Sequence, residues 1–127
     1  MHTGHPKPFV FAVDHPRFQA DVIDASHSHP ILVDFWADWC APCHALAPHL
    51  ERVVAEYAGR LRLATVEVDQ ADNMKLAGHY RLRGFPTVIF FQGGQERGRF
   101  SGSRSVHQLR EWIREHLCAE PANLGAA

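Results

Sequence analysis

Apolar runs with few polar interruptions predict the strands of this chain. Such runs lie at residues 9–13, 31–36, 61–68 and 88–91. Residues 31–36 are apolar except for Asp34, which is typical of a central strand covered on both faces. Gly93 and Gly94 follow the run at 88–91 and predict a turn into a hairpin with residues 97–101.

Apolar residues three and four positions apart predict the helices. These patterns cover residues 14–23, a long segment from Cys40 to Gly59, a short segment through residues 76–77, and residues 105–117. Asp14 before Pro16 is typical of a helix start, and Gly59 is typical of a helix end. Residues 27–30 predict a loop, and residues 69–73 predict a cap region before the short helix.

In chain order the segments are strand, helix, strand, helix, strand, helix, strand, strand and helix. This alternation predicts an α/β domain with a mixed sheet between helices. A length of 127 residues suits one domain. We expect a single domain over residues 1–127, with an ordered core at about 9–117 and flexible ends at 1–8 and 118–127.

The charge balance argues against a nucleic-acid or membrane partner. Lys and Arg number 13 against 14 for Asp and Glu, so the formal net charge is −1, and no basic stripe is present. No stretch reaches the roughly 18 apolar residues that a membrane span needs. Residues 1–8 lack the pattern of an export signal, so we expect a cytoplasmic protein.

The cysteines indicate redox chemistry. Cys40 and Cys43 are three positions apart where the strand at 31–36 gives way to a helix, and one further cysteine cannot complete a disulfide framework. Two thiols at this spacing can bond to each other, and a helix N-terminus favours the anionic form of the first. The pair therefore predicts dithiol/disulfide exchange, whereas Cys118 is expected to be a free surface thiol.

The expected position of Cys40 bears on its reactivity. Lowering the pKa of a cysteine from about 8.5 by about 1.5 units, which is worth roughly 2 kcal/mol, makes it about half ionised at neutral pH. A much lower pKa would reduce nucleophilicity. We expect Cys40 at the exposed start of the helix with a lowered pKa, and Cys43 more sheltered with a higher pKa.

Two other uses of these cysteines need weighing. Cys40, Cys43 and His44 satisfy the C-x-x-C-H pattern of covalent haem attachment, but Pro42 between the cysteines, the strand-rich surroundings and the lack of an export signal argue against it. A zinc site needs two more ligands at suitable spacing, and the 10 histidines of the chain show no such spacing. We therefore expect no metal site.

Several separated motifs in this order resemble the thioredoxin family. They are Trp36-Ala37-Asp38-Trp39-Cys40-Ala41-Pro42-Cys43, the preceding Asp34, the turn Gly84-Phe85-Pro86-Thr87, and Gly102. The likeness runs from about residue 9 to residue 117 and covers nearly all of the expected ordered core. It implies a thioredoxin fold, in which a central mixed β-sheet is flanked by helices.

The resemblance implies three catalytic residues. Cys40 attacks a substrate disulfide, and Cys43 resolves the mixed disulfide that forms. Burial of Asp34 in an apolar run raises its pKa and makes it a proton acceptor for Cys43, as in the family. Thr65 stands where the family often has a Lys, which removes a compensating charge and predicts a high pKa for Asp34.

The resemblance also implies a surface for substrate binding. Its residues are Trp39, Ala41, Pro42, Phe85, Pro86 and Gly102. A cis bond before Pro86 and pairing of the Phe85 backbone with an extended substrate segment are expected. Ala41 replaces the Gly common in the family, Phe85 is bulkier than the usual aliphatic residue, and His44 replaces a common Lys. We expect His44 to be mostly neutral beside the helix N-terminus.

Together these features predict a protein-disulfide reductase, an enzyme of electron transport and cell redox homeostasis. The expected partners are disulfide-containing client proteins and a thioredoxin reductase, whose FAD and NADPH act in trans, so that no bound cofactor is expected beyond the redox-active Cys40/Cys43 disulfide. A monomer is expected. The alternatives are a chaperone module that binds clients through Trp39, Pro42 and Phe85, or a disulfide oxidase or isomerase.

Overall fold

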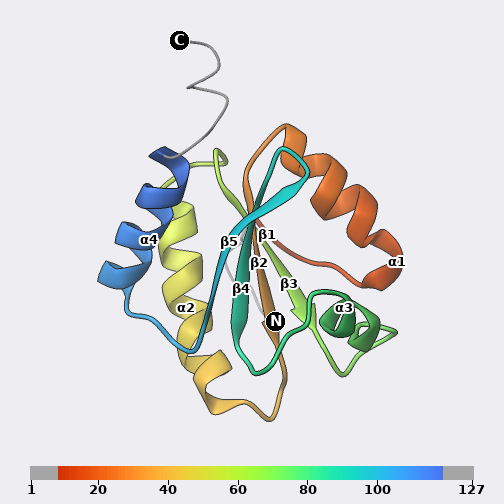
Figure 1. Ribbon diagram of the computed structural model, residues 1–127. Coiled ribbons are helices and arrows are strands. Elements are labelled where there is room, and N and C mark those ends of the chain that lie inside the picture. Colours follow the sequence, from red (N-terminus) through yellow and green to blue (C-terminus); the bar gives the residue numbers. More distant parts are fainter. Residues whose placement is uncertain (1–8, 119–127) are drawn as a thin grey trace, which may run out of the picture.

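In the part of the chain that the structure describes, five strands form one mixed sheet in the order β1-β3-β2-β4-β5 (Figure 1). The computed structural model describes residues 9–118, with the side chain of Cys118 outside that description. The strands are β1 (Val10–Ala12), β2 (Ile31–Trp36), β3 (Arg62–Glu67), β4 (Thr87–Gln92) and β5 (Gln95–Ser101). β2 lies between β3, which runs parallel to it, and β4, which runs antiparallel. The predicted α/β class, element order and mixed sheet are confirmed.

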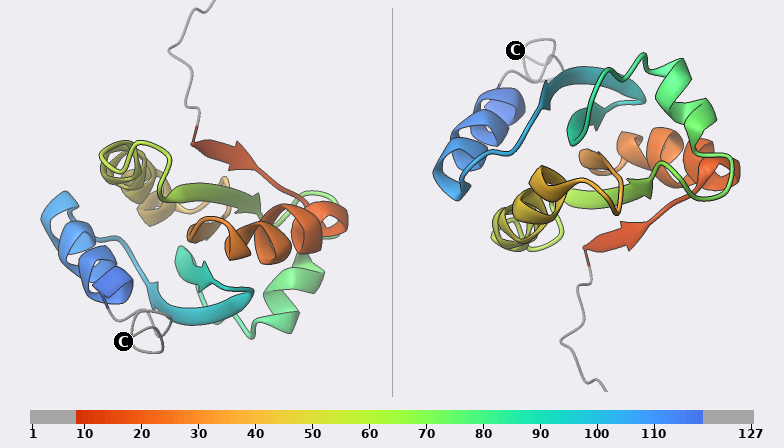
Figure 2. Two further views of the ribbon diagram at one scale, coloured as in Figure 1. Left: turned by 90° about the horizontal axis from the view of Figure 1, so that it is seen from above. Right: turned by 90° about the horizontal axis from the view of Figure 1, so that it is seen from below.

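Helices cover both faces of this sheet. They are α1 (His15–Phe18), which continues as a π-helical segment (Gln19–Asp24) and a 3₁₀ turn (Ala25–His27), and then α2 (Ala41–Ala55), α3 (Met74–His79) and α4 (Val106–Cys118). α1 and α3 lie on one face, and α2 and α4 lie side by side on the other (Figure 2). No helix in the described part of the chain is long and apolar enough to span a bilayer.

Successive side chains of β2 point to opposite faces of the sheet. Ile31, Val33 and Phe35 join the apolar cluster that contains Phe18 of α1, whereas Leu32 joins the cluster with the apolar residues of α2 and α4. Side chains two positions apart in a strand share a face. Asp34 therefore lies on the α2 face of the sheet.

A buried asparagine ties the two helices of the other face together. The Asn73 side chain donates to Asp14 Oδ1 and to the Glu67 carbonyl, both at 2.9 Å, and accepts from the His15 N–H at 2.7 Å. Residues 69–73 were predicted to cap α3, and Asn73 is its N-cap, but its side chain makes no cap bond. Its hydrogen bonds instead fix the start of α1 beside the end of β3.

Two predicted helix ends are wrong. α2 ends at Ala55 and not at Gly59, because hydrogen-bonded turns follow it and the backbone becomes left-handed at Ala58. The helix expected at 14–23 continues to His27, which shortens the predicted loop at 27–30. Of the predicted flexible ends, 1–8 and 118–127, the structure describes only the backbone of Cys118, which is the last residue of α4, and the other residues lie outside the described range.

Candidate redox site

Cys40 and Cys43 form a disulfide at the N-terminus of α2, where the chain leaves β2. Their Cα atoms lie 5.3 Å apart. Cys40 is the N-cap residue, and its Sγ accepts the Cys43 N–H at 3.2 Å. The sulfur thus occupies the place of an N-capping oxygen, at the positive end of the helix dipole. This surrounding favours a negative charge on Cys40 once the disulfide is reduced.

Both cysteines are buried, which corrects the expectation of an exposed Cys40. The exposed fraction is 4% for Cys40 and 1% for Cys43. The reason is that both belong to an apolar cluster of the core, against which the half-buried Trp36 and Phe85 pack. Only a small part of Cys40 is open to solvent in the disulfide state.

The two residues between the cysteines are exposed. Ala41 is the first residue of α2 and Pro42 the second. An N–H at these positions has no acceptor inside the helix, so the ring of Pro42 costs no hydrogen bond there. Ala41 and Pro42 therefore lie open to solvent at the start of α2.

The turn before β4 lies beside this helix start. The Phe85–Pro86 peptide bond is cis, as expected from the resemblance. Trp39 is 68% exposed, and its ring meets Phe85 edge-on at 6.1 Å between centroids. The structure thus brings Trp39 and Phe85 together next to the disulfide, on one surface with Ala41 and Pro42.

An unforeseen hydrogen bond fixes Trp39. Its Nε1 donates to Asp69 Oδ2 at 2.7 Å, across 30 positions of sequence. Asp69 follows β3, in the segment predicted from the sequence as a cap region. The bond orients an indole that would otherwise be free to turn on the surface.

Gly102 is hydrogen-bonded to the turn that contains Phe85 and Pro86. Its N–H donates to the Pro86 carbonyl at 2.9 Å, and its φ is +88°. A Cβ at this position would meet no atom within 4 Å, so the backbone conformation and not crowding favours glycine here.

Asp34 lines a cavity together with Cys43 and is almost fully buried. Its exposed fraction is 2%, and its Oδ1 has no hydrogen-bond partner. Burial raises its pKa from the ordinary value of 3.8 to about 7, with a smaller contribution from the negative charge of Glu51. The carboxyl can therefore take or release a proton near neutral pH.

A cavity of about 260 Å³ connects these groups. Its lining residues are Val10, Asp34, Trp36, Cys43, His44, Ala47, Glu51 and Thr65. Thr65 pairs in register with Asp34 on the neighbouring strand, as the sequence comparison with the family placed it. Thr65 brings no positive charge. The two carboxylates that line the cavity with Cys43 are those of Asp34 and Glu51.

Glu51 was not among the residues predicted for the site. Its signal is visible in the spacing, because Cys43, Ala47 and Glu51 follow each other at steps of four on α2. Residues at this spacing lie one above the other on a helix face. Glu51 therefore lines the same cavity as Asp34.

His44 lies at the rim of the site. Its Nε2 is 2.7 Å from the Asp38 carbonyl oxygen, so this nitrogen carries a hydrogen and donates it. The ring also meets Trp36 edge-on at 5.8 Å. His44 is therefore held by its neighbours at the opening of the Cys43 cavity.

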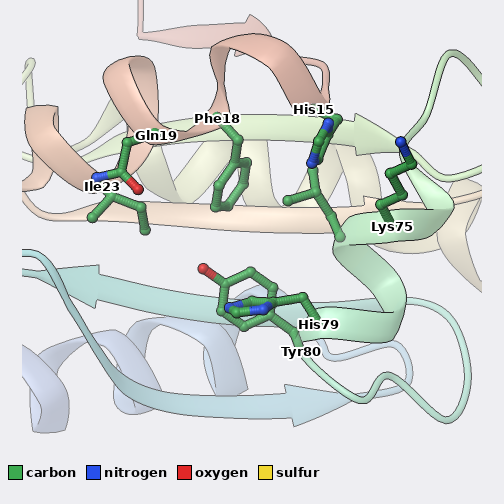
Figure 3. A pocket seen from close by; sticks show the side chains of 8 residues that line it. His15, Phe18, Gln19, Ile23, Lys75, His79 and Tyr80 are labelled. Carbon is green, nitrogen blue, oxygen red and sulfur yellow. The ribbon is translucent and has the colours of Figure 1, made fainter.

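The described residues contain no group of three or more metal-ligating side chains placed to hold a metal ion. A separate cavity of about 320 Å³ lies between α1 and α3, on the other face of the sheet (Figure 3). It is lined by His15, Phe18, Gln19, Ile23, Lys75, Leu76, His79 and Tyr80. None of the predicted site residues lies there.

The family profile and the relatives that match this chain carry the same description, thioredoxin. Residues 9–115 match the family profile described as Thioredoxin. A thioredoxin of Acidithiobacillus ferridurans is 38% identical over 108 residues, which are 85% of this chain and 96% of that protein. Thioredoxin C-2 of Corynebacterium nephridii is 39% identical over 101 residues, or 80% of this chain and 90% of that protein.

A longer relative carries the matching region as one part. The bifunctional thioredoxin reductase/thioredoxin of Mycobacterium leprae is 42% identical over 92 residues. These residues are 72% of this chain but only 19% of that protein.

Proposed function

This chain belongs to the thioredoxin family and is a protein-disulfide reductase with a Cys40/Cys43 redox pair, and we propose that Cys40 is the attacking thiol, Cys43 the resolving thiol and Asp34 the proton acceptor. The observation that carries this assignment is the disulfide at the N-cap of α2 with a buried, titratable carboxyl in the adjoining cavity. Such an exchange needs no bound cofactor, because the two sulfurs carry the electrons.

In the first step the Cys40 thiolate attacks one sulfur of a client disulfide. A bond forms between Cys40 and that sulfur, and the other client sulfur leaves as a thiolate that takes a proton from water. The Cys43 N–H and the N-terminus of α2 stabilise the thiolate before the attack. This position supports Cys40, and not Cys43, as the nucleophile.

In the second step Cys43 attacks Cys40 in the mixed disulfide. The Cys43 thiol first gives its proton to the Asp34 carboxylate, and the second client sulfur then leaves as a thiolate. Cys43 and Asp34 line one cavity, and a pKa of about 7 suits a base that works near neutral pH. The client is reduced, and the Cys40–Cys43 disulfide is restored.

Client binding uses the exposed surface around the disulfide. Trp39 and Phe85 form an edge-on pair there, and Pro42 is exposed beside them. Because Cys40 is nearly buried, an extended client segment lying against the Phe85–Pro86 turn presents its disulfide better than a bulky folded surface does. Ala41 and Gly102 border the same surface.

Reduction of the Cys40–Cys43 disulfide after each cycle requires an external electron donor. We assign this role to a thioredoxin reductase that acts in trans with FAD and NADPH, and the Mycobacterium leprae relative, which joins a reductase and a thioredoxin in its name, supports the assignment. We further propose that the protein is a monomer of the reducing cytoplasm, where such a donor keeps the pair reduced.

Other functions are not favoured. A client-binding chaperone module would need only the surface of Trp39, Pro42 and Phe85, whereas this chain also has two cysteines bonded at a helix start. Haem attachment would consume the two sulfurs that are joined here. The choice between reductase and oxidase or isomerase in the cell depends on the potential difference with the partners.

The assignment of roles is tested with single cysteine variants and a disulfide-bonded client such as insulin. Cys43→Ser is expected to accumulate a covalent adduct with the client, because the first attack proceeds and the resolving thiol is missing. Cys40→Ser is expected to form no adduct and to lose reduction. Cys118→Ser is the matched control and should behave as the unmodified protein. An adduct on Cys40→Ser in place of Cys43→Ser would reverse the assignment.

A further inference from the structure

The loop between β5 and α4 forms one border of the proposed client surface. It comprises residues 102–105, and its first residue, Gly102, donates its N–H to the Pro86 carbonyl at 2.9 Å. The next residue, Ser103, is exposed. The loop is therefore bonded directly to the turn against which an extended client segment is proposed to lie.

His49 of α2 is hydrogen-bonded to the middle of this loop. Its Nδ1 lies 3.0 Å from the Arg104 carbonyl oxygen, across 55 positions of sequence. A carbonyl oxygen can only accept, so Nδ1 carries the hydrogen and donates it. The His49 side chain is half-buried. The helix that carries Cys40 at its start is thus joined directly to the loop.

The side chain of Arg104 is held as well. Its guanidinium lies over the Phe100 ring, 4.4 Å from the ring centroid, which is a cation–π contact. Phe100 is 5% exposed, and its ring meets Trp112 of α4 edge-on at 5.0 Å. With its carbonyl bound by His49 and its guanidinium over a buried ring, Arg104 has little freedom to turn.

The rest of the loop is held mainly at its two ends. Residues 103–105 belong to no helix or strand. At the end near α4, the Ser105 N–H donates to Gln108 Oε1 at 2.9 Å. At the other end, Gly102 has no side chain with which to pack. The bond from His49 fixes the backbone between these two ends.

We propose that His49 is a positioning residue for client binding, whose bond from Nδ1 to the Arg104 carbonyl holds the loop 102–105 at the border of the client surface. This proposal rests on the proposed client surface around the disulfide. His49 does not line the cavity of Asp34 and Cys43, so it acts on binding through the loop and not on the proton transfer.

A border that is fixed before the client binds lowers the entropy that binding costs. Loss of one such hydrogen bond should weaken client binding about two- to tenfold. The loop contacts the client segment in the same way before and during the attack on the disulfide. An interaction of this kind changes the half-saturating client concentration and leaves the maximal rate unchanged.

The kinetic test mixes the reduced protein with an excess of a disulfide-bonded client peptide in a single turnover. His49→Leu should raise the half-saturating peptide concentration about threefold and leave the plateau rate unchanged. His49→Asn should restore most of the affinity, because the Asn amide nitrogen can donate from the place of Nδ1. His107→Leu changes an exposed histidine of α4 and is the matched control. Equal half-saturating concentrations for His49→Leu and His107→Leu would overturn the proposal.

A small disulfide separates client positioning from damage to the redox site. Hydroxyethyl disulfide offers no extended segment that could lie against the turn and the loop. All three variants should therefore reduce it at the rate of the unmodified protein. If His49→Leu lost as much rate with this compound as with the client peptide, the substitution would act on the redox site itself and the proposal would be wrong.

The hydrogen bond can also be tested without a client. At about pH 8, where the imidazole is neutral, NMR of the ring nitrogens should show the hydrogen of His49 on Nδ1, because the Arg104 carbonyl needs a donor there. A hydrogen on Nε2 would contradict the proposal. If Cys40→Ser still reduced the client, the proposed function would fail, while the ring spectrum would still decide whether His49 holds the loop.

Discussion

At the scale of single residues, the site depends on two groups placed where they are unusual. Cys40 puts a sulfur at the N-cap of α2, where an oxygen side chain is the common choice. Asp34 puts a carboxyl in the buried middle of β2, where the neighbouring Thr65 offers no charge. Both placements alter proton affinity, in opposite directions, because the helix N-terminus favours an anion and burial disfavours one.

Burial of Asp34 makes stability depend on pH. The folded state binds the Asp34 proton more tightly than the unfolded state, whose pKa is near the ordinary 3.8, whereas the folded value is about 7. Its contribution to stability is therefore full below about pH 4 and is lost as the pH rises to about 7. Asparagine cannot ionise, so Asp34→Asn removes this loss.

The disulfide form of Asp34→Asn tests this pH dependence of stability. Relative to the unmodified protein it should gain on the order of a few kcal/mol of unfolding free energy between about pH 4 and about pH 8. Urea unfolding of both proteins at the two pH values measures this gain. A stability difference that stays the same at both pH values would show that Asp34 does not titrate in this range.

At the scale of elements, the ends of helices and strands place the site residues. The N-terminus of α2 carries Cys40, the turn before β4 carries Phe85, and the loop after β5 carries Gly102. α4 packs beside α2 on the same face of the sheet. The start of α4 is a capping box, in which Ser105 Oγ accepts the Gln108 N–H at 3.1 Å and Gln108 Oε1 accepts the Ser105 N–H at 2.9 Å.

Loss of this cap should affect stability and not chemistry. Ser105→Ala is expected to lower the free energy of unfolding by about 1 kcal/mol, because the Gln108 N–H loses its acceptor. The rate of insulin reduction by the folded protein should not change. Chemical denaturation and the reduction assay on the same sample check both parts, and a marked loss of rate at full folding would mean that α4 takes part in the site.

Element order and type were predictable from the sequence, whereas some element ends were not. The apolar run that forms β2 and the Gly93-Gly94 turn carry local signals, and both glycines adopt positive φ in the hairpin. The local signal at the end of α2 was misleading. Gly59 has positive φ, but the helix already ends at Ala55. Helix ends depend on hydrogen bonds of the following turns, which a glycine alone does not determine.

At the scale of the whole molecule, the site is made by segments that meet only in the fold. The disulfide pair, the burial of Asp34 and its pairing with Thr65 were predictable, because a local motif and a family resemblance carried them. The bond from Trp39 to Asp69 and the position of Glu51 were not predicted, because both depend on how α2 and the end of β3 pack against β2. Burial of Cys40 likewise depends on its packing into the core.

The central claim is that the position of Cys40 at the N-terminus of α2 makes its sulfur anionic near neutral pH. The most direct measurement is the rate of alkylation of Cys40 against pH, in a variant with Cys43→Ser and Cys118→Ser that leaves it as the only thiol. The account predicts that the rate rises with a midpoint near about pH 7. A midpoint near about 8.5, the value of free cysteine, would contradict it.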